Sequence, residues 1–233
     1  MINHLESILA ISLTTVGFIC FYFIIHSEKL RQKFVSRYGE DSSLSYWFYF
    51  RRSIGMFLFG IVLLLVNVVW LPYQLSDYGV ASQNWVTTLI WTFGLSAIII
   101  PMNAFASRNP KNLIQYPEIR TQIWTKNILF WSAITWIGYL LAYEFMFRGV
   151  LLFACERAMG VELAITINVA IYAFFHIHKG LREAIGAIPL GVVLCLLTLK
   201  TGTIWIAFFV HVVLSLSNEW FSLKYHPKIR VLR

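Results

Sequence analysis

The stretch ILFWSAITWIGYLLAYEFMFRGVLLFA, from Ile128 to Ala154, is long and apolar enough to cross a bilayer, yet it carries Glu144 and Arg148 in its interior. A carboxylate in the hydrocarbon layer costs roughly 2.5 to 3.5 kcal/mol on insertion scales, so such a residue usually faces a protein-lined cavity and serves a function there. The i,i+4 spacing places both head groups on one helix face, within reach of each other. The structural alternative is an ion pair that only ties helices together.

The composition of the whole chain agrees with a membrane setting. Its 233 residues are 58% hydrophobic and only 13% charged, and the mean hydropathy is +0.68, outside the range of soluble domains. Seven stretches approach the roughly 20 apolar residues that a spanning helix needs, namely Ser7 to His26, Ser53 to Tyr73, Trp85 to Ala104, Ile128 to Ala154, Val161 to Phe175, Ile185 to Leu199 and Ile204 to Leu216. We therefore predict an all-α, polytopic transmembrane helical bundle of about seven spans.

The 19 Lys and Arg residues are unevenly divided between the two sides of such a bundle. Sixteen fall in segments that alternating spans place on one side, whereas Arg157 and Lys200 fall on the other side and Arg148 lies inside a span. By the positive-inside rule, we expect a multi-pass protein of the cell membrane with its N-terminus outside and its C-terminus in the cytoplasm. The net charge of +8 then provides contacts for membrane lipid headgroups. A nucleic-acid partner is not expected, because no soluble domain is present to hold a duplex.

The character of the chain changes near residue 105. Residues 1–105 are expected to form N-terminal transmembrane helices without catalytic motifs, and residues 106–233 a catalytic membrane domain. The second part opens with a polar stretch in which Pro117 precedes three apolar residues, Ile119, Ile123 and Trp124. A proline at a helix start, followed by apolar residues on one face, predicts a short interfacial helix that leads into the fourth span.

A polar stripe runs along the span that begins at Val161. Asn168, Tyr172 and His176 follow one another at i, i+4 and i+8, so they lie on one face of a helix whose other faces are apolar. Such a stripe is expected to face protein or water. The alternative for His176 is that it only satisfies a neighbouring backbone carbonyl.

The last span carries His211, with Ser215 and Asn218 on the same face at i+4 and i+7. Together with Glu144 and His176, it completes a set of one carboxylate and two imidazoles on three membrane helices. Such a set is sufficient for water activation with charge stabilisation. It is equally sufficient for a metal site with two His ligands, one Glu ligand and an open position.

These residues resemble the motifs of a known family over roughly residues 113 to 222. Glu144-Phe-Met-Phe-Arg148-Gly149 resembles E-E-x-x-x-R, the first motif of the CAAX protease and bacteriocin-processing (CPBP or Abi) family of intramembrane proteases. Tyr172-x-x-x-His176 resembles the second motif, F-x-x-x-H, and His211 resembles the histidine of the third, H-x-x-x-N.

The chain departs from this family pattern at two positions. The leading glutamate of the first motif is Tyr143 here, and the asparagine of the third motif is Ser215. A second register, Phe174-x-x-x-His178, also fits the middle motif, but His176 is expected to lie deeper in the membrane.

The resemblance implies a type II CAAX prenyl endopeptidase-like protease that hydrolyses peptide bonds in or next to the bilayer. In the implied mechanism, Glu144 and His176 activate a water, while His211 donates to the oxyanion. The implied supporting residues are Arg148, Tyr172, Asn168, Ser215 and Asn218. The resemblance leaves open whether a cofactor takes part. We expect none, with zinc on Glu144, His176 and His211 as the alternative.

The implied partners are membrane lipid and a peptide or protein substrate that is prenylated or embedded in the membrane. Two other functions stay open. One is a non-catalytic immunity or scaffold protein that kept the fold, which the departures at Tyr143 and Ser215 favour. The other is a small proton-coupled transporter that uses the same ionisable residues as a relay.

Overall fold

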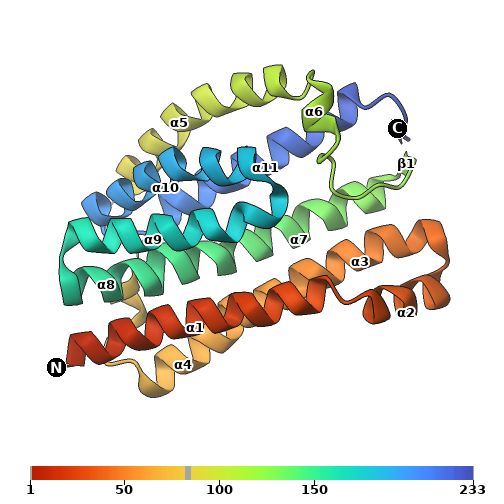
Figure 1. Ribbon diagram of the computed structural model, residues 1–233. Helices are drawn as coiled ribbons and strands as arrows, with labels where there is room; N and C mark the ends of the chain where they lie inside the picture. The colour runs from red at the N-terminus through yellow and green to blue at the C-terminus, as the bar shows by residue number, and fades with distance from the viewer. Residues whose placement is uncertain (1, 82–84, 233) are drawn as a thin grey trace.

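The computed structural model describes residues 2–81 and 85–232, and this part of the chain is almost entirely helical (Figure 1). In chain order the elements are α1 (Ile2–Ile25), α2 (Glu28–Tyr38), α3 (Glu40–Gly55), the π-helix η1 (Met56–Ile61), α4 (Val62–Trp70), the 3-10 helix η2 (Leu75–Tyr78), α5 (Trp85–Ala106), α6 (Pro110–Leu113), β1 (Ile123–Trp124), α7 (Lys126–Glu144), the π-helix η3 (Phe145–Leu151), α8 (Leu152–Met159), α9 (Val161–His176), the 3-10 helix η4 (Ile177–Lys179), α10 (Leu181–Thr201), α11 (Trp205–Tyr225) and β2 (Arg230–Val231). The all-α prediction is confirmed.

Within the described residues, six helices are long and apolar enough to cross a membrane. They are Ile2–Ile25, Glu40–Trp70, Trp85–Ala106, Lys126–Met159, Leu181–Thr201 and Trp205–Tyr225. The seventh predicted span is α9, whose 16 residues reach about 24 Å at 1.5 Å per residue, less than the roughly 30 Å of the hydrocarbon layer. It packs against α8 and α10, which enclose it on two sides. The chain is therefore a multi-pass helical membrane protein.

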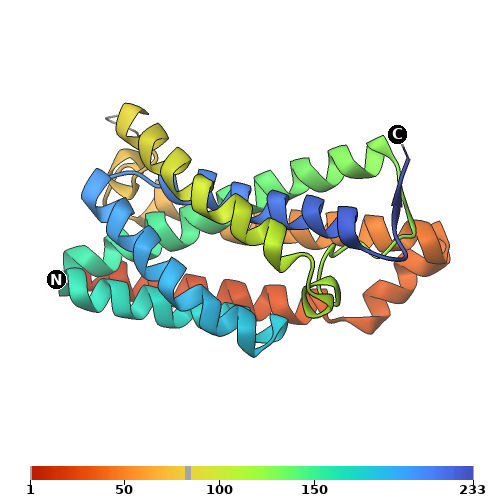
Figure 2. The same cartoon turned by 90° about the horizontal axis from the view of Figure 1, so that it is seen from above.

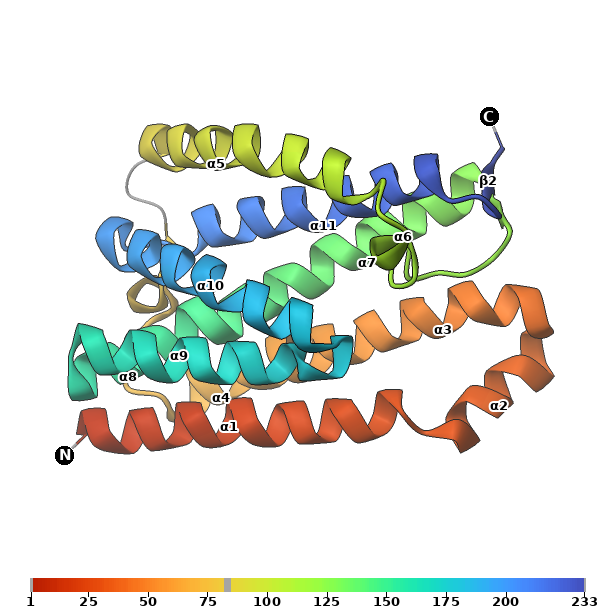
Figure 3. The same cartoon turned by 45° about the horizontal axis from the view of Figure 1, so that its top comes forward.

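The continuous helix formed by α7, η3 and α8 is the centre of the bundle. In its most apolar window 72% of the residues are buried inside the protein, whereas the figure for α5 is 17%. Figure 3 shows α7 running between α3 and α11, and both helices contact it. A charged residue on this helix therefore faces protein and not lipid, which removes most of the cost of placing it at membrane depth.

Small residues allow the first and second halves of the chain to approach closely. A Cβ added at Gly138 of α7 would lie 2.5 Å from Sδ of Met56, and one added at Gly60 of η1 would lie 2.9 Å from Cβ of Ala142. Membrane helices use such small residues to bring their backbones together, because lipid provides no hydrophobic force between helices. The packing fixes the end of α7, where Glu144 lies, against the N-terminal helices.

The expected interfacial helix after Pro117 is not present, and this prediction was wrong. The loop that precedes α7 holds the short helix α6 at Pro110–Leu113, but the residues after Pro117 run as an irregular loop into β1. There, Ile123↔Arg230 and Trp124↔Val231 are paired in parallel. In an interfacial helix these backbone groups would form hydrogen bonds within the helix. Here the carbonyl oxygens of Gln122 and Trp124 accept from the backbone N–H groups of Arg230 and Leu232 in the C-terminal segment.

The two ends of the described chain lie at opposite ends of the bundle (Figure 2). The helical segments alternate in direction along the bundle (Figure 1), with α2, the loop between α6 and β1, and the C-terminal strand at the same end. The connections that hold most of the basic residues are thus gathered toward this end.

Candidate active site

Glu144 lies where the regular α-helix of α7 changes into the π-helix η3. Single turns of π-helix inside longer helices are frequent at functional sites. Nη1 of Arg148, one turn further on, lies 3.2 Å from Oε2 of Glu144, and both side chains are completely buried. The contact expected from the i,i+4 spacing is therefore present. It compensates the carboxylate charge inside the bundle.

His211 of α11 contacts the other oxygen of the same carboxylate. The distance between Nδ1 of His211 and Oε1 of Glu144 is 2.6 Å. Because an ionised carboxylate can only accept a hydrogen bond, Nδ1 is the donor, and in the neutral ring Nε2 is then the nitrogen that can accept a proton. The carboxylate thus fixes both the orientation and the tautomer of the imidazole.

A cavity of about 750 Å³ adjoins this cluster; we call it the membrane cavity. Five residues of the predicted site line it, namely Tyr172, His176, His211, Ser215 and Asn218, and so does Tyr143. Most of its remaining wall is apolar, as is usual for a ligand site with a few oriented polar groups. Glu144 and Arg148 do not line the cavity, so their charges act on it through His211 and the tyrosines.

The two histidines flank the same pair of tyrosine rings. The ring centroid of Tyr172 lies 4.6 Å from that of His176 and 6.4 Å from that of His211. For Tyr143 the corresponding distances are 6.5 and 5.8 Å. Nδ1 of His176 donates to the carbonyl oxygen of Tyr172 at 2.8 Å, which orients the imidazole from its own helix. The two predicted imidazoles therefore lie at the wall of the membrane cavity, and the carboxylate of Glu144 lies behind His211.

Comparison with family models identifies this region. Residues 125–217 match the family described as type II CAAX prenyl endopeptidase Rce1-like. These residues form an Rce1-like domain of the CPBP family. The match begins at Thr125, the residue that caps the N-terminus of α7, and it contains Glu144, His176 and His211. Neither a curated protein nor a solved structure matches the chain.

Asn168 is not part of the cavity wall, although the sequence placed it in the polar stripe of the Rce1-like domain. Its Nδ2 donates to the carbonyl oxygen of Phe147 at 2.6 Å, and its Oδ1 accepts from Sγ of Cys195 at 3.2 Å. These contacts tie α9 and α10 to η3, directly beside Arg148. Asn168 therefore positions the π-helix, and we assign it no contact with substrate.

The polar residues that follow His211 on α11 differ in their surroundings. Ser215 is half-buried at the cavity wall. Asn218 also lines the cavity, but its Oδ1 accepts hydrogen bonds from Oγ of Ser107 at 3.3 Å and Nδ2 of Asn112 at 3.1 Å. Asn218 therefore joins α11 to the segment around α6. The side chain of His178, the alternative for the middle motif, lies outside the part of the chain that the structure describes.

Tyr172 also faces the buried cation of the Rce1-like domain. The guanidinium carbon of Arg148 lies 4.3 Å from the centroid of the Tyr172 ring. A cation over a tyrosine face is attracted to the ring, and more so where water is excluded. The mild change from Phe to Tyr in the second motif keeps this contact.

A second buried charge cluster was missed in the sequence. Arg52, which directly precedes the expected span from Ser53 to Tyr73, lies inside α3 and is buried. Its Nη2 is 3.5 Å from Oε2 of Glu219 and 3.2 Å from Oε2 of Glu118. Glu219 also accepts from Oγ of Ser132 at 2.7 Å and Nε1 of Trp136 at 3.0 Å. The signal that could have revealed it is the apolar pattern continuing through Trp220 to Leu223 beyond the expected end of the last span.

The arrangement of the donor groups decides whether the candidate site fits a metal ion. Among residues 2–81 and 85–232, no three His, Cys, Asp or Glu side chains are grouped closely enough to hold a metal ion. Oε1 of Glu144 lies 2.6 Å from Nδ1 of His211 and Oε2 lies 3.2 Å from Nη1 of Arg148, although Oε2 accepts no hydrogen bond from the described residues. The zinc set of Glu144, His176 and His211 does not fit this arrangement, and the mechanism below contains no step through a metal.

Proposed function

We propose that this protein is an intramembrane endopeptidase that hydrolyses peptide bonds in or next to the bilayer by metal-independent activation of water. The observation that carries the proposal is the 2.6 Å contact between His211 and Glu144 at the wall of the membrane cavity. Membership of the Rce1-like family, whose members are typically proteases, supports it. The same family implies peptide substrates.

In the proposed mechanism His211 is the general base. Its Nε2 takes a proton from a water in the membrane cavity, and the hydroxide oxygen attacks the scissile carbonyl carbon. Glu144, whose negative charge lies against Nδ1, stabilises the resulting imidazolium, as carboxylates do in other histidine-based hydrolases. The imidazolium then returns the proton to the leaving amine. We give Glu144 this positioning role because it does not line the cavity, whereas His211 does.

The tetrahedral intermediate also requires donors for its oxyanion, because this is commonly the largest single contribution to such catalysis. We assign this role to the hydroxyls of Tyr143 and Ser215, both of which line the cavity. His176 also lines it, but because its Nδ1 already donates to Tyr172, its Nε2 can donate to the oxyanion only in the doubly protonated ring. Tyr143 stands where the family motif has its leading glutamate. A hydroxyl at this position supplies a donor in place of a carboxylate, and it leaves His211 as the base.

The proposal is tested by comparing newly formed protein N-termini in membranes of cells that express the wild-type protein or a Glu144→Gln variant. We expect a set of cleavage sites in or next to apolar segments that disappears in the variant. Glu219→Gln is the matched control, because Glu219 is equally buried but belongs to the Arg52 cluster. Cleavage that persists in Glu144→Gln would contradict the mechanism.

A second function, a non-catalytic scaffold, is favoured by one observation. Glu144 and Arg148 form a completely buried ion pair, which by itself can hold the centre of the bundle together. The scaffold predicts that Glu144→Gln lowers expression and thermal stability as strongly as Arg148→Ala. The peptidase predicts a folded Glu144→Gln protein without activity.

We also infer that the N-terminus lies outside and the C-terminus in the cytoplasm of the cell membrane. The excess of Lys and Arg in the connections near α2 and the C-terminus supports this orientation. The alternating direction of the helical segments supports it as well, because it leaves the two ends of the chain on opposite sides (Figure 2).

A further inference from the structure

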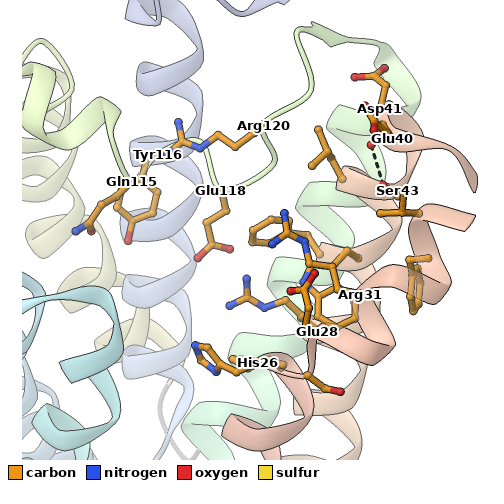
Figure 4. Close-up of a pocket in the computed structure, with 18 of the residues that line it drawn as sticks. His26, Glu28, Arg31, Glu40, Asp41, Ser43, Gln115, Tyr116, Glu118 and Arg120 are labelled. Atoms are coloured by element: carbon orange, nitrogen blue, oxygen red, sulfur yellow. Dashed lines mark hydrogen bonds between the residues drawn. The ribbon is translucent and has the colours of Figure 1, made fainter.

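A second cavity, of about 1040 Å³, lies at the end of the bundle that holds α2 (Figure 4). We call it the polar cavity. Its walls come from the end of α1, from α2 and α3, and from the loop between α6 and β1. Figure 4 shows Glu118 and Arg120 on the loop side and Glu28 and Arg31 on the opposite side. Neither the family match nor the proposed mechanism assigns a role to this cavity.

The polar cavity carries charges of both signs. Its basic residues are Arg31, Arg51, Arg120 and Lys179, and its acidic residues are Glu28, Glu40, Asp41 and Glu118. Neighbouring charges of opposite sign reduce the field that would concentrate a purely anionic or purely cationic ligand. Such a wall instead suits a ligand that offers polar groups and both charges along its length. A hydrophilic stretch of polypeptide has this chemistry.

Two guanidinium groups that line the polar cavity are available to donate hydrogen bonds to a ligand. Arg51 lies over the ring of Phe48, with its guanidinium carbon 4.7 Å from the centroid. Within the described part of the chain, the side chains of Arg51 and Arg31 form no hydrogen bond or ion pair. Each guanidinium offers five N–H donors, which can bind backbone carbonyls or carboxylates.

The polar cavity and the membrane cavity share a wall. Gln115, Tyr116 and Lys179 line both of them. Nε2 of Gln115 donates to the carbonyl oxygen of Lys179 at 2.7 Å, and Nζ of Lys179 lies 3.5 Å from Oε1 of Glu118. These two contacts connect the loop before β1 to η4. The shared wall is therefore made by two segments that are joined through one side-chain-to-backbone hydrogen bond and one ion pair.

The two sides of the Lys179–Glu118 contact are held differently. Glu118 is fixed from behind by Arg52, at 3.2 Å, and Arg52 is itself fixed by Ser132. Lys179 is 27% exposed and precedes Gly180, whose φ of 101° favours glycine and its wider conformational freedom. A partly exposed ammonium group can leave its partner for water more readily than a buried guanidinium can. Lys179 is thus the side of the wall that can move.

We propose that the polar cavity binds the hydrophilic, mixed-charge segment of a membrane-anchored polypeptide whose apolar segment enters the membrane cavity. The chain passes from one cavity to the other where Lys179 leaves Glu118. The inference rests on the proposed peptidase function for the identity of the ligand as a substrate. It concerns binding alone, however, and it can be tested without cleavage.

The test uses the full chain with His211→Ala in nanodiscs of phosphatidylcholine. The probe is a fluorescent peptide that contains alternating Glu, Lys and Ser and carries a palmitoyl chain at one end. We expect saturable binding that weakens on the order of tenfold in Arg31→Gln/Arg51→Gln. The control is Lys33→Gln/Arg37→Gln, which removes the same charge from exposed positions of α2 outside the cavity and should bind the probe normally. Equal binding by all three proteins would overturn the proposal.

A second measurement does not depend on the folding of the charge variants. In a Cys20→Ala background, Val35→Cys places a thiol at the polar cavity, whereas Ser36→Cys places one on the exposed side of the same helix. The probe should slow labelling of Val35→Cys by a charged maleimide and leave labelling of Ser36→Cys unchanged. If a saturating concentration of the probe does not slow the labelling of Val35→Cys, the proposed binding site is wrong. If the probe binds but the protein cleaves no substrate, the proposed peptidase function is wrong and the proposed binding site is still supported.

Discussion

Nδ1 of His211 lies 2.6 Å from Oε1 of Glu144, although the two residues are 67 positions apart in the chain. The contact joins the end of α7 to the interior of α11. Since Arg148 holds the second carboxylate oxygen, the carboxylate is balanced by a cation on one side and polarises an imidazole on the other. An imidazole held in this way keeps one orientation, and Nε2 is its nitrogen that can accept a proton.

Replacing His211 by Ala is expected to lower the turnover of a cleaved substrate by about 10² to 10⁴-fold, because general-base catalysis contributes an amount of this order. Glu144→Gln should also lose activity, because a neutral amide does not stabilise the imidazolium. Its amide oxygen can still accept from Arg148, so we expect this variant to lose less stability in detergent than Arg148→Ala. The measurement is single-turnover cleavage of a substrate found by comparing protein N-termini. Full activity of either variant would exclude the proposed pair.

Arg148→Ala is expected to affect folding as well as activity. Removing one partner of a buried ion pair costs about 3 to 5 kcal/mol, because the remaining charge is left uncompensated. Thermal unfolding of the purified variant in detergent should therefore begin at a clearly lower temperature than that of the wild type. Lys33→Ala, at an exposed position of α2, is the control and should unfold like the wild type. An unchanged unfolding temperature for Arg148→Ala would show that the pair is not needed for stability.

Chelation separates the two chemistries that the sequence left open. Treatment with EDTA and phenanthroline should leave cleavage unchanged, because the proposed mechanism uses the Glu144–His211 pair without a metal. A zinc protease in the same nanodiscs is the positive control and should lose activity. Loss of cleavage that added Zn²⁺ restores would instead support zinc bound by Glu144, His176 and His211.

We expect the folding stability of the protein to depend on pH through the ionisation of Glu118. Burial acts to raise the pKa of this carboxyl, but the nearby charges of Lys179, Arg52 and Arg51 outweigh it and lower the pKa from 4.5 to about 2. Because the folded-state pKa is depressed, the stabilisation is fully present above pH 4.5 and is lost as the pH falls toward 2. One pKa unit corresponds to 1.36 kcal/mol, so the stabilisation by ionised Glu118 amounts to about 3 kcal/mol at most.

Glu118→Gln provides the comparison for this prediction. The difference in unfolding temperature between the wild type and the variant should be largest near neutral pH and should vanish as the pH falls toward 2. A difference that stays constant over this range would show that the charge of Glu118 does not stabilise the fold.

The orientation in the membrane is tested with reporters. A reporter fused after Arg233 should lie in the cytoplasm, and one inserted between residues 74 and 84 should lie outside, because the positive charges gather at the opposite end of the bundle. Substituted cysteines and a membrane-impermeant reagent provide an independent check. If both reporters lie on the same side, one of the helical segments between them does not cross the membrane. The short helix α9 is the first candidate.

Part of the candidate site could be predicted from local spacing. The contact of Glu144 with Arg148 follows from the geometry of one helical turn, and the stripe of Tyr172 and His176 follows from the same period. These relations need no knowledge of the other helices. The interfacial helix after Pro117 was mispredicted because strand pairing with residues 230 and 231 uses the same backbone groups, and the sequence around Pro117 carries no sign of that partner.

The sequence by itself determined the helical membrane architecture and the burial of a charged pair, because hydrophobic length and helical period are local properties of the chain. Only the tertiary structure decided that His211 meets Glu144, that Arg52 meets Glu219, and that Lys179 meets Glu118 where two cavities adjoin. These contacts join distant segments, and they depend on which faces of the helices pack together. The packing of the helices depends on close contacts such as that of Gly138 with Met56. Such contacts require that the surfaces of two helices fit together, and the sequence pattern of either helix alone does not show this fit.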